Sequence, residues 1–316
     1  MGIRYLNRYL QSNCNEGIKQ INLHELSGKK IAIDTSIYLY RYMGENALLE
    51  NFYLMISIFR EYNISPLFVF DGKPPQQKED LLKLRKEEKK EAEQKYKQLQ
   101  ETIKNADEDE KKEILENLDT LKKMFIKIHH SDIDNVKSLI KSYGVSYIDA
   151  CGEADKLCAK LVNKNKVYAC LSEDMDLFVY GCNRVLRYLS LLKKSVVLYD
   201  YKRILSELKL SCDEFKSICI ISGTDYNIDT NNNLIKTLKL FKKYKKDSES
   251  KLSFYEWLEE HTDYISDICE LYQIHLLFSL TDMDEYKKYE KTKIINGPIN
   301  MECLRNIMSK ENFLFC

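Results

Sequence analysis

Three short apolar segments that each lead into acidic side chains constrain the fold of this chain more than any other feature. KKIAID and LFVFD end on Asp34 and Asp71, and VYACL runs into Asp174 and Asp176. Near-continuous apolar runs separated by helical stretches, such as the one at about 37–62, are typical of a parallel sheet with helices on both faces. The sequence therefore predicts an α/β fold with a mostly parallel central sheet.

The acids that follow these segments are expected to share one edge of the sheet, because ligands in such sheets bind at the carboxyl ends of the strands. Two acid pairs, Glu153/Asp155 and Asp174/Asp176, have a spacing of two residues. Residues two apart point to the same side in extended backbone. Glu153 is predicted at a helix entrance, where the backbone is not yet helical and the helix dipole favours anions. Each pair can therefore aim both carboxylates at one point.

These acids, together with the one in ISGTDY, form a candidate metal-binding set. Its members are Asp34, Asp71, Glu153, Asp155, Asp174, Asp176 and Asp225. Carboxylates this close cannot all ionise without compensation. An all-oxygen ligand set without His or Cys selects Mg²⁺ or Mn²⁺, and two such ions can clamp the attacking and leaving oxygens in phosphodiester cleavage. Individually solvated surface acids would explain any one member but explain the set poorly.

A highly charged stretch without Gly or Pro interrupts this pattern. More than half of the residues from 78 to 123 are charged, and both signs are present in similar numbers. Apolar residues recur at alternating spacings of four and three in two runs, which begin at Ala92 and Ile114. The polar stretch 104–110 between them is predicted to be a bend. We expect a helical hairpin inserted at about 76–130, and a solvated arm without a chemical role fits the spacing equally well.

The remainder of the chain is predicted to be mainly helical. We expect a nuclease-like α/β domain at 1–227 and a helical region at 228–316. Residues 236–246 carry six lysines and no acid, interleaved with apolar residues. This segment could contact a phosphate backbone or be an ordinary solvated helix face. The candidate DNA-binding lysines are Lys242, Lys243, Lys245 and Lys246.

Composition limits the class of protein and its compartment. Lys+Arg and Asp+Glu balance at 49 each, so any nucleic-acid surface must be local. The ten cysteines include no Cys-x-x-Cys pair, which is typical of free thiols in a reducing compartment. No secretory signal and no apolar run approaching 18 residues is found. We expect a soluble intracellular protein of the nucleus or cytoplasm, and the Asn-, Ile- and Lys-rich composition suggests an AT-rich, conceivably viral, genome.

Six motifs, in order along the chain, resemble those of the flap endonuclease family, the XPG-type structure-specific 5′ nucleases. They are MGI, IAIDTSIYLY, FVFDGKPPQQK, GEADKLCAKLV, VYACLSEDMDLFVYG and ISGTDYN. The match spans roughly 1–227, and the charged insert falls where the family has its helical arch. The resemblance implies a PIN-like fold in which the seven acids hold two Mg²⁺ ions, with Mn²⁺ able to substitute. It implies cleavage of DNA with 5′ flaps, gaps or free 5′ ends during replication, repair or recombination.

The resemblance also implies roles for single residues. Lys78 and Arg85 fall on the two basic positions that draw the scissile phosphate onto the metals, and their spacing of seven puts them on one helix face. Tyr40 falls where the family stacks an aromatic ring on a base beside the cleaved bond. Gly2 matches the motif at the start of the chain, near the site. Asp155 is one methylene shorter than the glutamate usual in flap endonucleases.

Two departures from the family concern its partners. The family's glycine-rich hairpin, which grips duplex phosphates, is replaced at 227–234 by a segment without glycine. The lysines that follow are expected to bind duplex DNA by charge, with little dependence on a monovalent ion. No sliding-clamp motif is found before Cys316, so no clamp partner is predicted.

Two other functions remain alternatives. A metal-dependent phosphatase also uses an Asp-x-Asp motif after a strand, as in Asp174/Asp176, but it needs its nucleophile on the first strand, where Asp34 lacks a second Asp two residues on. A non-catalytic nucleic-acid-binding relic of a nuclease would have no reason to keep seven mutually repelling acids.

Overall fold

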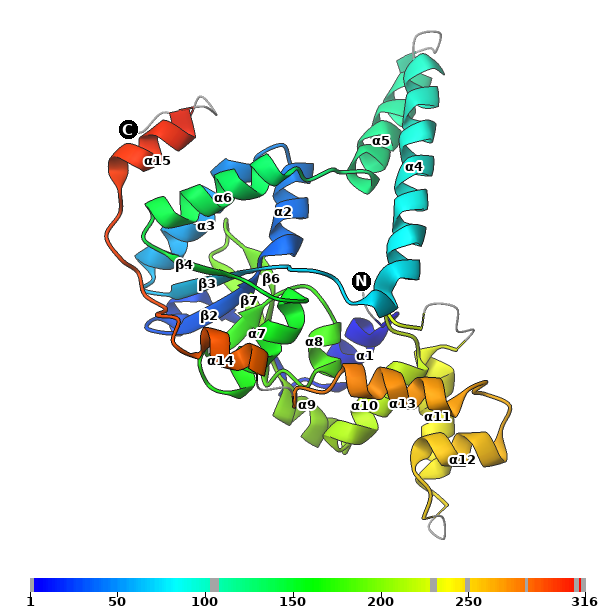
Figure 1. Cartoon of the computed structure of the whole chain (residues 1–316). Helices are drawn as coiled ribbons and strands as arrows, with labels where there is room; N and C mark the ends of the chain where they lie inside the picture. Colours follow the sequence, from blue (N-terminus) through cyan, green and yellow to red (C-terminus); the bar gives the residue numbers. More distant parts are fainter. Residues whose placement is uncertain are drawn as a thin grey trace.

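The computed structural model describes residues 3–102, 108–227, 232–247, 251–281, 284–309 and 313. In this part of the chain, seven strands form one sheet in the order β1-β7-β6-β5-β2-β3-β4 (Figure 1). The strands are β1 (Ile18–Asn22), β2 (Lys30–Asp34), β3 (Ser65–Phe70), β4 (Ser146–Asp149), β5 (Ala169–Leu171), β6 (Arg184–Ser190) and β7 (Ser195–Asp200). Those from β6 to β4 pair in parallel, and β7 and β1 extend the sheet antiparallel. The predicted mostly parallel sheet is confirmed.

Helices cover both faces of this sheet. Those that build the body are α1 (Leu6–Asn13), α2 (Thr35–Gly44), α3 (Leu48–Glu61), α6 (His130–Ser142), α7 (Ala154–Asn163), α8 (Asp176–Val179), α9 (Tyr201–Leu208), α10 (Cys212–Ile221), α11 (Leu234–Tyr244), α12 (Phe254–His261), α13 (Ile268–Leu277), α14 (Asp284–Glu290) and α15 (Met301–Met308). Short 3₁₀ helices lie at η1 (Leu23–Leu26) and η2 (Gln76–Lys78). None of the described helices is both long and apolar enough to cross a membrane.

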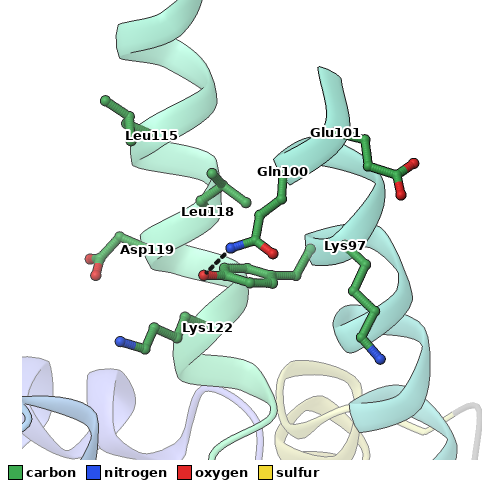
Figure 2. Close-up of a pocket in the computed structure, with 8 residues that line it drawn as sticks. Lys97, Gln100, Glu101, Leu115, Leu118, Asp119 and Lys122 are labelled. Carbon is green, nitrogen blue, oxygen red and sulfur yellow. Dashed lines mark hydrogen bonds between the residues drawn. The ribbon is translucent and has the colours of Figure 1, made fainter. Parts of the chain in front are cut away.

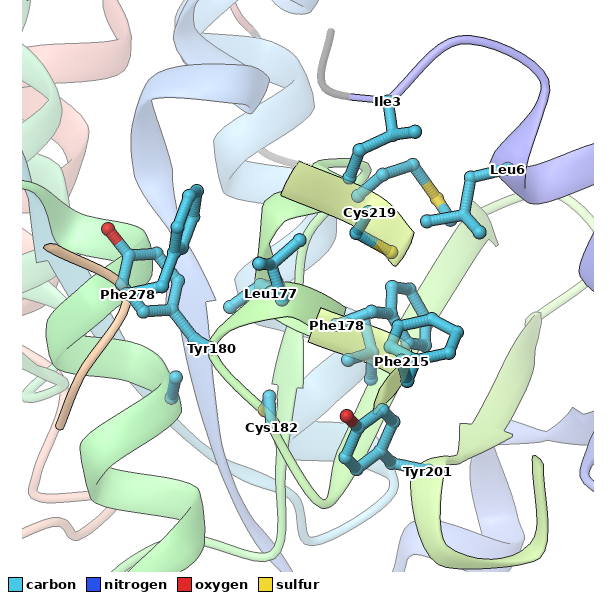
Figure 3. Close-up of a cluster of buried hydrophobic side chains, with 14 of the residues drawn as sticks. Ile3, Leu6, Leu177, Phe178, Tyr180, Cys182, Tyr201, Phe215, Cys219 and Phe278 are labelled. Atoms are coloured by element: carbon cyan, nitrogen blue, oxygen red, sulfur yellow. The ribbon is translucent and has the colours of Figure 1, made fainter. Parts of the chain in front are cut away.

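Alternation along the strands divides the interior into two hydrophobic clusters. Ile31 and Ile33 of β2 belong to a cluster with α2, α3, α6 and α15, whereas Ala32 belongs to the cluster with α1, α7, α8 and α10. Successive side chains of a strand point to opposite faces, so one short strand supplies both layers. Figure 3 shows part of the second cluster, where Phe178 of α8 packs beside Phe215 of α10.

The helical stretch predicted at about 37–62 is in fact two helices, α2 and α3. Asn46, between them, has a φ of 52°, which lies in the left-handed region that a continuous helix cannot contain. Asn tolerates this region better than most residues. The periodicity of the apolar residues carried no sign of this break.

The charged insert forms the predicted hairpin of two helices, α4 (Glu79–Thr102) and α5 (Glu108–Met124), which rises away from the sheet (Figure 1). Figure 2 shows the facing surfaces of the two helices, where the Gln100 Nε2 donates to the Tyr96 hydroxyl at 3.0 Å and Leu118 lies on the opposite helix. Ala92 and Leu118 are buried, in agreement with the two predicted apolar stripes. Residues 104–107 of the predicted bend lie outside the described residues, and residues 108–110, also predicted to be in the bend, instead begin α5.

The helices after β7 pack against the α/β core. Leu234, Phe241 and Leu258 belong to the same hydrophobic cluster as Leu157 of α7 and Cys219 of α10. The chain then returns across the sheet, where Val145 and Asn296 form an isolated β-bridge and Leu304 of α15 packs with α3 and α6. The hydrophobic interior is therefore continuous across residue 227, and the predicted division there stays a prediction.

Candidate metal centre

The predicted acids lie at the carboxyl ends of adjacent parallel strands. Asp34 is the last residue of β2, Asp71 follows β3 directly, and Asp174 follows β5. These three strands are neighbours in the order β5-β2-β3, so their ends meet at one edge. Asp225 reaches the same place from the end of α10.

Glu153 occupies the entrance of α7, as the sequence predicted. It is the N-cap residue, with an extended backbone of φ −78° and ψ 137°, and Asp155 lies in the first turn of the helix. As is usual at an N-cap, the Glu153 backbone is extended although its carbonyl group already accepts the first helical hydrogen bond, from Leu157. The start of α7 therefore places two carboxylates, those of Glu153 and Asp155, close together.

Burial and mutual repulsion disturb the ionisation of this cluster. Asp34, Asp155 and Asp176 are 5%, 8% and 1% exposed. Burial, followed by repulsion from Asp71, raises the pKa of Asp34 to about 8. Burial also raises the pKa of Asp155 and of Asp176 well above the usual range, and the carboxylates of Glu153 and Asp174 add to these shifts. The site thus holds more negative charge than it can keep ionised without cations.

Hydrogen bonds order the loop that carries Asp174 and Asp176. The Ser172 hydroxyl donates to Asp34 Oδ2 at 2.8 Å and accepts the Asp174 N–H at 3.0 Å. The Asp176 N–H in turn donates to Asp174 Oδ1 at 3.0 Å. Asp176 Oδ1, by contrast, is buried and has no hydrogen-bond partner in the part of the chain that the structure describes. A buried anionic oxygen without a partner is costly, and a cation is the partner that its chemistry fits.

Two more acids, Asp71 and Glu153, accept hydrogen bonds from polar groups that the sequence analysis missed. The Ser36 hydroxyl and the Ala154 N–H, the latter at 2.8 Å, donate to Asp71. The Tyr226 hydroxyl donates to Glu153 at 2.6 Å. Ser36 and Tyr226 each lie within two residues of a predicted acid, which is the one signal that could have found them.

Two basic side chains from the base of the arch enter the cluster. Lys78 Nζ lies 2.5 Å from Glu153 Oε1 and 3.7 Å from Asp225 Oδ2, and Arg85 Nη2 lies 3.0 Å from the same Asp225 oxygen. Burial opposes the charge of Lys78, but the carboxylates of Asp155 and Glu153 outweigh it and raise the pKa of the lysine above its usual range. Lys78 and Arg85 therefore point to one site, and in the structure both contact acids of the candidate metal-binding set.

The donor set fits a hard divalent cation, although its side chains are engaged elsewhere. No group of three or more His, Cys, Asp or Glu side chains within the described residues is arranged to hold a metal ion as it stands. Two of the acids, Glu153 and Asp225, are instead paired with Lys78 and Arg85. The buried, mutually repelling carboxylates and the orphaned Asp176 oxygen remain, and these are the features that an all-oxygen metal site requires.

Glu173, which precedes Asp174 in the sequence, is compensated by a different set of groups. Its carboxylate accepts the Tyr188 N–H at 2.7 Å and lies 3.3 Å from Arg41 Nη2 and 3.5 Å from Arg187 Nε. This acid is therefore paired with arginines and does not join the seven.

The predicted DNA contacts beside the centre have mixed positions. Tyr40 of α2 is 45% exposed, and Lys89 Nζ of the arch lies 4.8 Å from the centroid of its ring. The ring is thus available at the surface between the arch and the body. Gly2 lies outside the described residues.

The surface between the arch base and the C-terminal helices is more acidic than the sequence suggested. A cavity of about 590 Å³ adjoins Asp225, and Asp80, Asp263, Asp267 and Glu270 line it together with Lys236. Of the four candidate lysines near the end of α11, Lys245 forms an ion pair with Glu214 at 2.7 Å. Residues 228–231 of the glycine-free segment lie outside the described residues.

Relatives with known names resemble the chain over most of its length. Flap endonuclease 1 of Aedes aegypti is 34% identical over 245 residues, which are 72% of this chain and 62% of that relative. The enzyme of the same name from Anoplopoma fimbria is 35% identical over the same shares. The chain thus spans about three fifths of the length of the curated relatives that it matches.

Solved structures share the fold. The catalytic core of Rad2 in complex with DNA substrate superposes with a TM-score of 0.68 at 19% identity, covering 98% of this chain and 95% of that one. Flap endonuclease-1 from Methanococcus jannaschii superposes with a TM-score of 0.64 at 24% identity, covering 98% and 93%. The PIN-like nuclease fold implied by the sequence motifs is confirmed.

Family models give the assignment. The model of the XPG N-terminal domain matches residues 1–92, and the model of the XPG I-region matches residues 144–225. Together they span more than half of the chain, and the gap between them contains the greater part of the arch. The chain belongs to the XPG family.

Proposed function

We propose that this protein is a divalent-metal-dependent, structure-specific 5′ nuclease that hydrolyses phosphodiester bonds in branched, nicked or gapped DNA. The observation that carries the proposal is the buried carboxylate cluster, with its orphaned Asp176 oxygen, lying beside two cationic side chains of the arch. The names of the curated relatives, flap endonuclease 1, support it. So does the family assignment.

The seven acids would hold Mg²⁺, or Mn²⁺ in its place. Two ions bound here would act as Lewis acids toward a phosphodiester. The residues themselves contribute orientation: Ser172 fixes Asp34 and Asp174 relative to each other, and Ala154 fixes Asp71 at the entrance of α7. These bonds come from the backbone and from short side chains, so they hold the carboxylates with little loss of entropy.

Lys78 and Arg85 would act on the substrate phosphate. In the structure they bond to Glu153 and Asp225. Cations bound at these carboxylates would replace the two side chains there and leave them free to donate to a phosphodiester between the arch and the metals. Charged donors placed in this way stabilise a phosphate more strongly as its negative charge grows.

The remaining assignments follow from this function. Residues 1–227 would form the nuclease domain and 228–316 a region that contacts duplex DNA through α11. Tyr40 would stack on a base next to the cleaved bond. DNA processing places the protein where DNA is replicated or repaired, in the nucleus or cytoplasm.

The test is cleavage of branched DNA labelled at either the 5′ or the 3′ end, across a Mg²⁺ titration and in excess EDTA. The proposal expects metal-dependent products cut near the branch, and no cleavage with EDTA. Release of inorganic phosphate without an internal cut would instead assign a phosphatase. Full activity in EDTA would overturn the metal mechanism.

A further inference from the structure

A second pocket lies among the C-terminal helices, apart from the carboxylate cluster. It has a volume of about 330 Å³ and is formed by α10, α11, α12 and α13, at the lower right of Figure 1. Four aromatic side chains dominate its lining: Tyr244, Phe254, Tyr255 and Tyr272. None of these residues belongs to the proposed nuclease site.

The three tyrosines are fixed in place by their hydroxyl groups, and Phe254 by ring contacts with Phe241 and Tyr244. Tyr244 donates to the Leu252 carbonyl at 3.0 Å, Tyr272 bonds with Ser253 at 3.0 Å, and Tyr255 bonds with His275 Nδ1 at 3.2 Å. The rings of Tyr255 and Tyr272 meet at 82° with 5.2 Å between centroids. Because the polar tips are engaged, the pocket presents the carbon rings as preformed walls.

A carboxylate at the rim gives the pocket a negative charge. The Asp213 side chain is 80% exposed, and its oxygen lies 3.1 Å from His275 Nε2. Burial, followed by the nearby charge of Lys216, lowers the pKa of His275 below its usual value. The Asp213 carboxylate and the His275 imidazole thus form a polar pair at the rim, and the cation of Lys216 lies near the imidazole. The other rim acid, Glu214, is paired with Lys245.

We propose that this pocket binds an arginine side chain presented by a partner protein. Aromatic rings attract a desolvated cation, and a guanidinium both stacks on rings and bonds to a carboxylate with two donors. Asp213 supplies the carboxylate. A nucleic acid fits less well, because the exposed Asp213 carboxylate would repel its phosphates.

The surface next to the pocket indicates where the rest of the partner segment would lie. Leu276 is 72% exposed and Tyr272 is 41% exposed. They are four residues apart on α13 and so share one face of the helix. This apolar strip suits a hydrophobic residue near the arginine in the partner, which would add contact area beyond the pocket.

The experiment titrates Nα-acetyl-arginine amide into the full chain and compares it with the citrulline analogue, which has the same shape without the charge. Trp257, the only tryptophan of the chain, lies 6.0 Å from the Tyr244 ring and reports binding through its fluorescence. Calorimetry serves as a second readout. We expect saturable binding of the arginine probe and at least tenfold weaker binding of citrulline.

Variants locate the binding. Asp213→Asn should weaken the arginine probe at least fivefold, and Tyr272→Leu should weaken it while the fold is retained. Glu260→Gln, which removes an exposed acid of α12 outside the pocket, is the matched control and should bind normally. None of the three changes should alter metal-dependent DNA cleavage, so this inference can fail or succeed independently of the nuclease.

Three results would overturn the proposal. They are equal binding of arginine and citrulline, no effect of Asp213→Asn, and no saturable binding up to the solubility limit of the probe. Tighter binding of thymidine monophosphate than of the arginine probe would assign the pocket to a nucleotide base instead.

Discussion

At the scale of residues, acids that are adjacent in sequence have different partners. Glu173 is paired with Arg41 and Arg187, and Asp174 accepts the Asp176 N–H. Asp176 itself keeps one buried oxygen that has no partner among the described residues. The unpartnered oxygen of Asp176 is the part of the cluster that a cation would satisfy most directly.

The Asp176 side chain offers the most direct test of this difference. Asp176→Asn replaces a buried carboxyl group, whose ionisation is opposed by burial and by neighbouring acids, with a neutral amide, so stability in EDTA should stay equal or increase. Cleavage should fall by at least two orders of magnitude, since one metal ligand and its charge are lost. Thermal denaturation and single-turnover cleavage measure the two effects, with Glu61→Gln, an exposed acid paired with Lys194, as the control. Near-normal cleavage by the variant would refute the metal assignment.

Lys78 should stabilise the protein when metal is absent and promote DNA cleavage when metal is bound. Lys78→Met removes the cation that lies between Glu153 and Asp225, so the variant should unfold at a lower temperature in EDTA and gain more from Mg²⁺ than the wild type. The activation barrier of its single-turnover cleavage should rise by about 3 kcal/mol, as on loss of one preorganised donor. Its affinity for DNA should change little.

Lys83→Met is the matched control for that change, because Lys83 is exposed on the adjoining helix α4 and pairs with Asp80, outside the carboxylate cluster. Normal cleavage by the Lys78→Met variant would show that the base of the arch has no chemical role and acts only as a spacer.

Six of the seven acids could be located from the sequence because each follows a recognisable strand or lies at the start of a helix, whereas Asp225 follows helix α10 and was found through the motif alone. Their compensation could not be predicted. Arg187 and Glu173 are brought together by pairing between β5 and β6, and Lys78 reaches Glu153 only because the chain folds back over 75 positions. Contacts between residues that are far apart in the chain produce no periodic pattern in the sequence, so they could not be predicted from it.

At the scale of elements, the helices with regular apolar spacing were the predictable part. The arch was found from two stripes, since a helical hairpin is stabilised mostly by contacts between its own faces. The break between α2 and α3 was missed, because it depends on one Asn in a left-handed conformation. The acidic cavity beside Asp225 was also missed, since its acids come from α4 and from the segment around α13.

The α11 element carries the prediction about duplex DNA. Each lysine that neutralises a phosphate adds about 0.9 to the slope of log affinity against log salt. Replacing Lys242, Lys243 and Lys246 with Gln should therefore flatten the slope. Lys245→Gln should change it little, because that lysine is already paired with Glu214. Fluorescence anisotropy with a duplex of fixed length, in KCl and in NaCl, makes the measurement.

An unchanged slope in the triple variant, combined with a strict requirement for K⁺, would assign duplex binding to the segment around residues 227–234 instead of the lysines.

At the scale of the whole molecule, the C-terminal part of the chain is bound to the α/β core at two places. The first is the hydrophobic cluster shared by α10–α13 and α7, and the second is α15 packed on α3 and α6. Arg60 of α3 strengthens the return of the chain, because its guanidinium donates to the carbonyl groups of Tyr143 and Gly297 at 2.8 and 3.0 Å. Because helices after residue 227 contribute to both hydrophobic clusters of the sheet, the chain should unfold as one unit.

Leu304 provides the measurement of that coupling. Its side chain is 1% exposed, so Leu304→Ala should cost about 2–5 kcal/mol of unfolding free energy from lost burial and a residual cavity. The exposed Ile299 on the same return segment is the control, and its change to Ala should cost far less. Unfolding in urea should give coincident transitions by far-ultraviolet circular dichroism and by fluorescence of Trp257, which lies in α12 far along the chain from α15. If Leu304→Ala shifts the circular dichroism transition but leaves the Trp257 transition in place, the helical region unfolds independently and the division near residue 227 marks a true domain boundary.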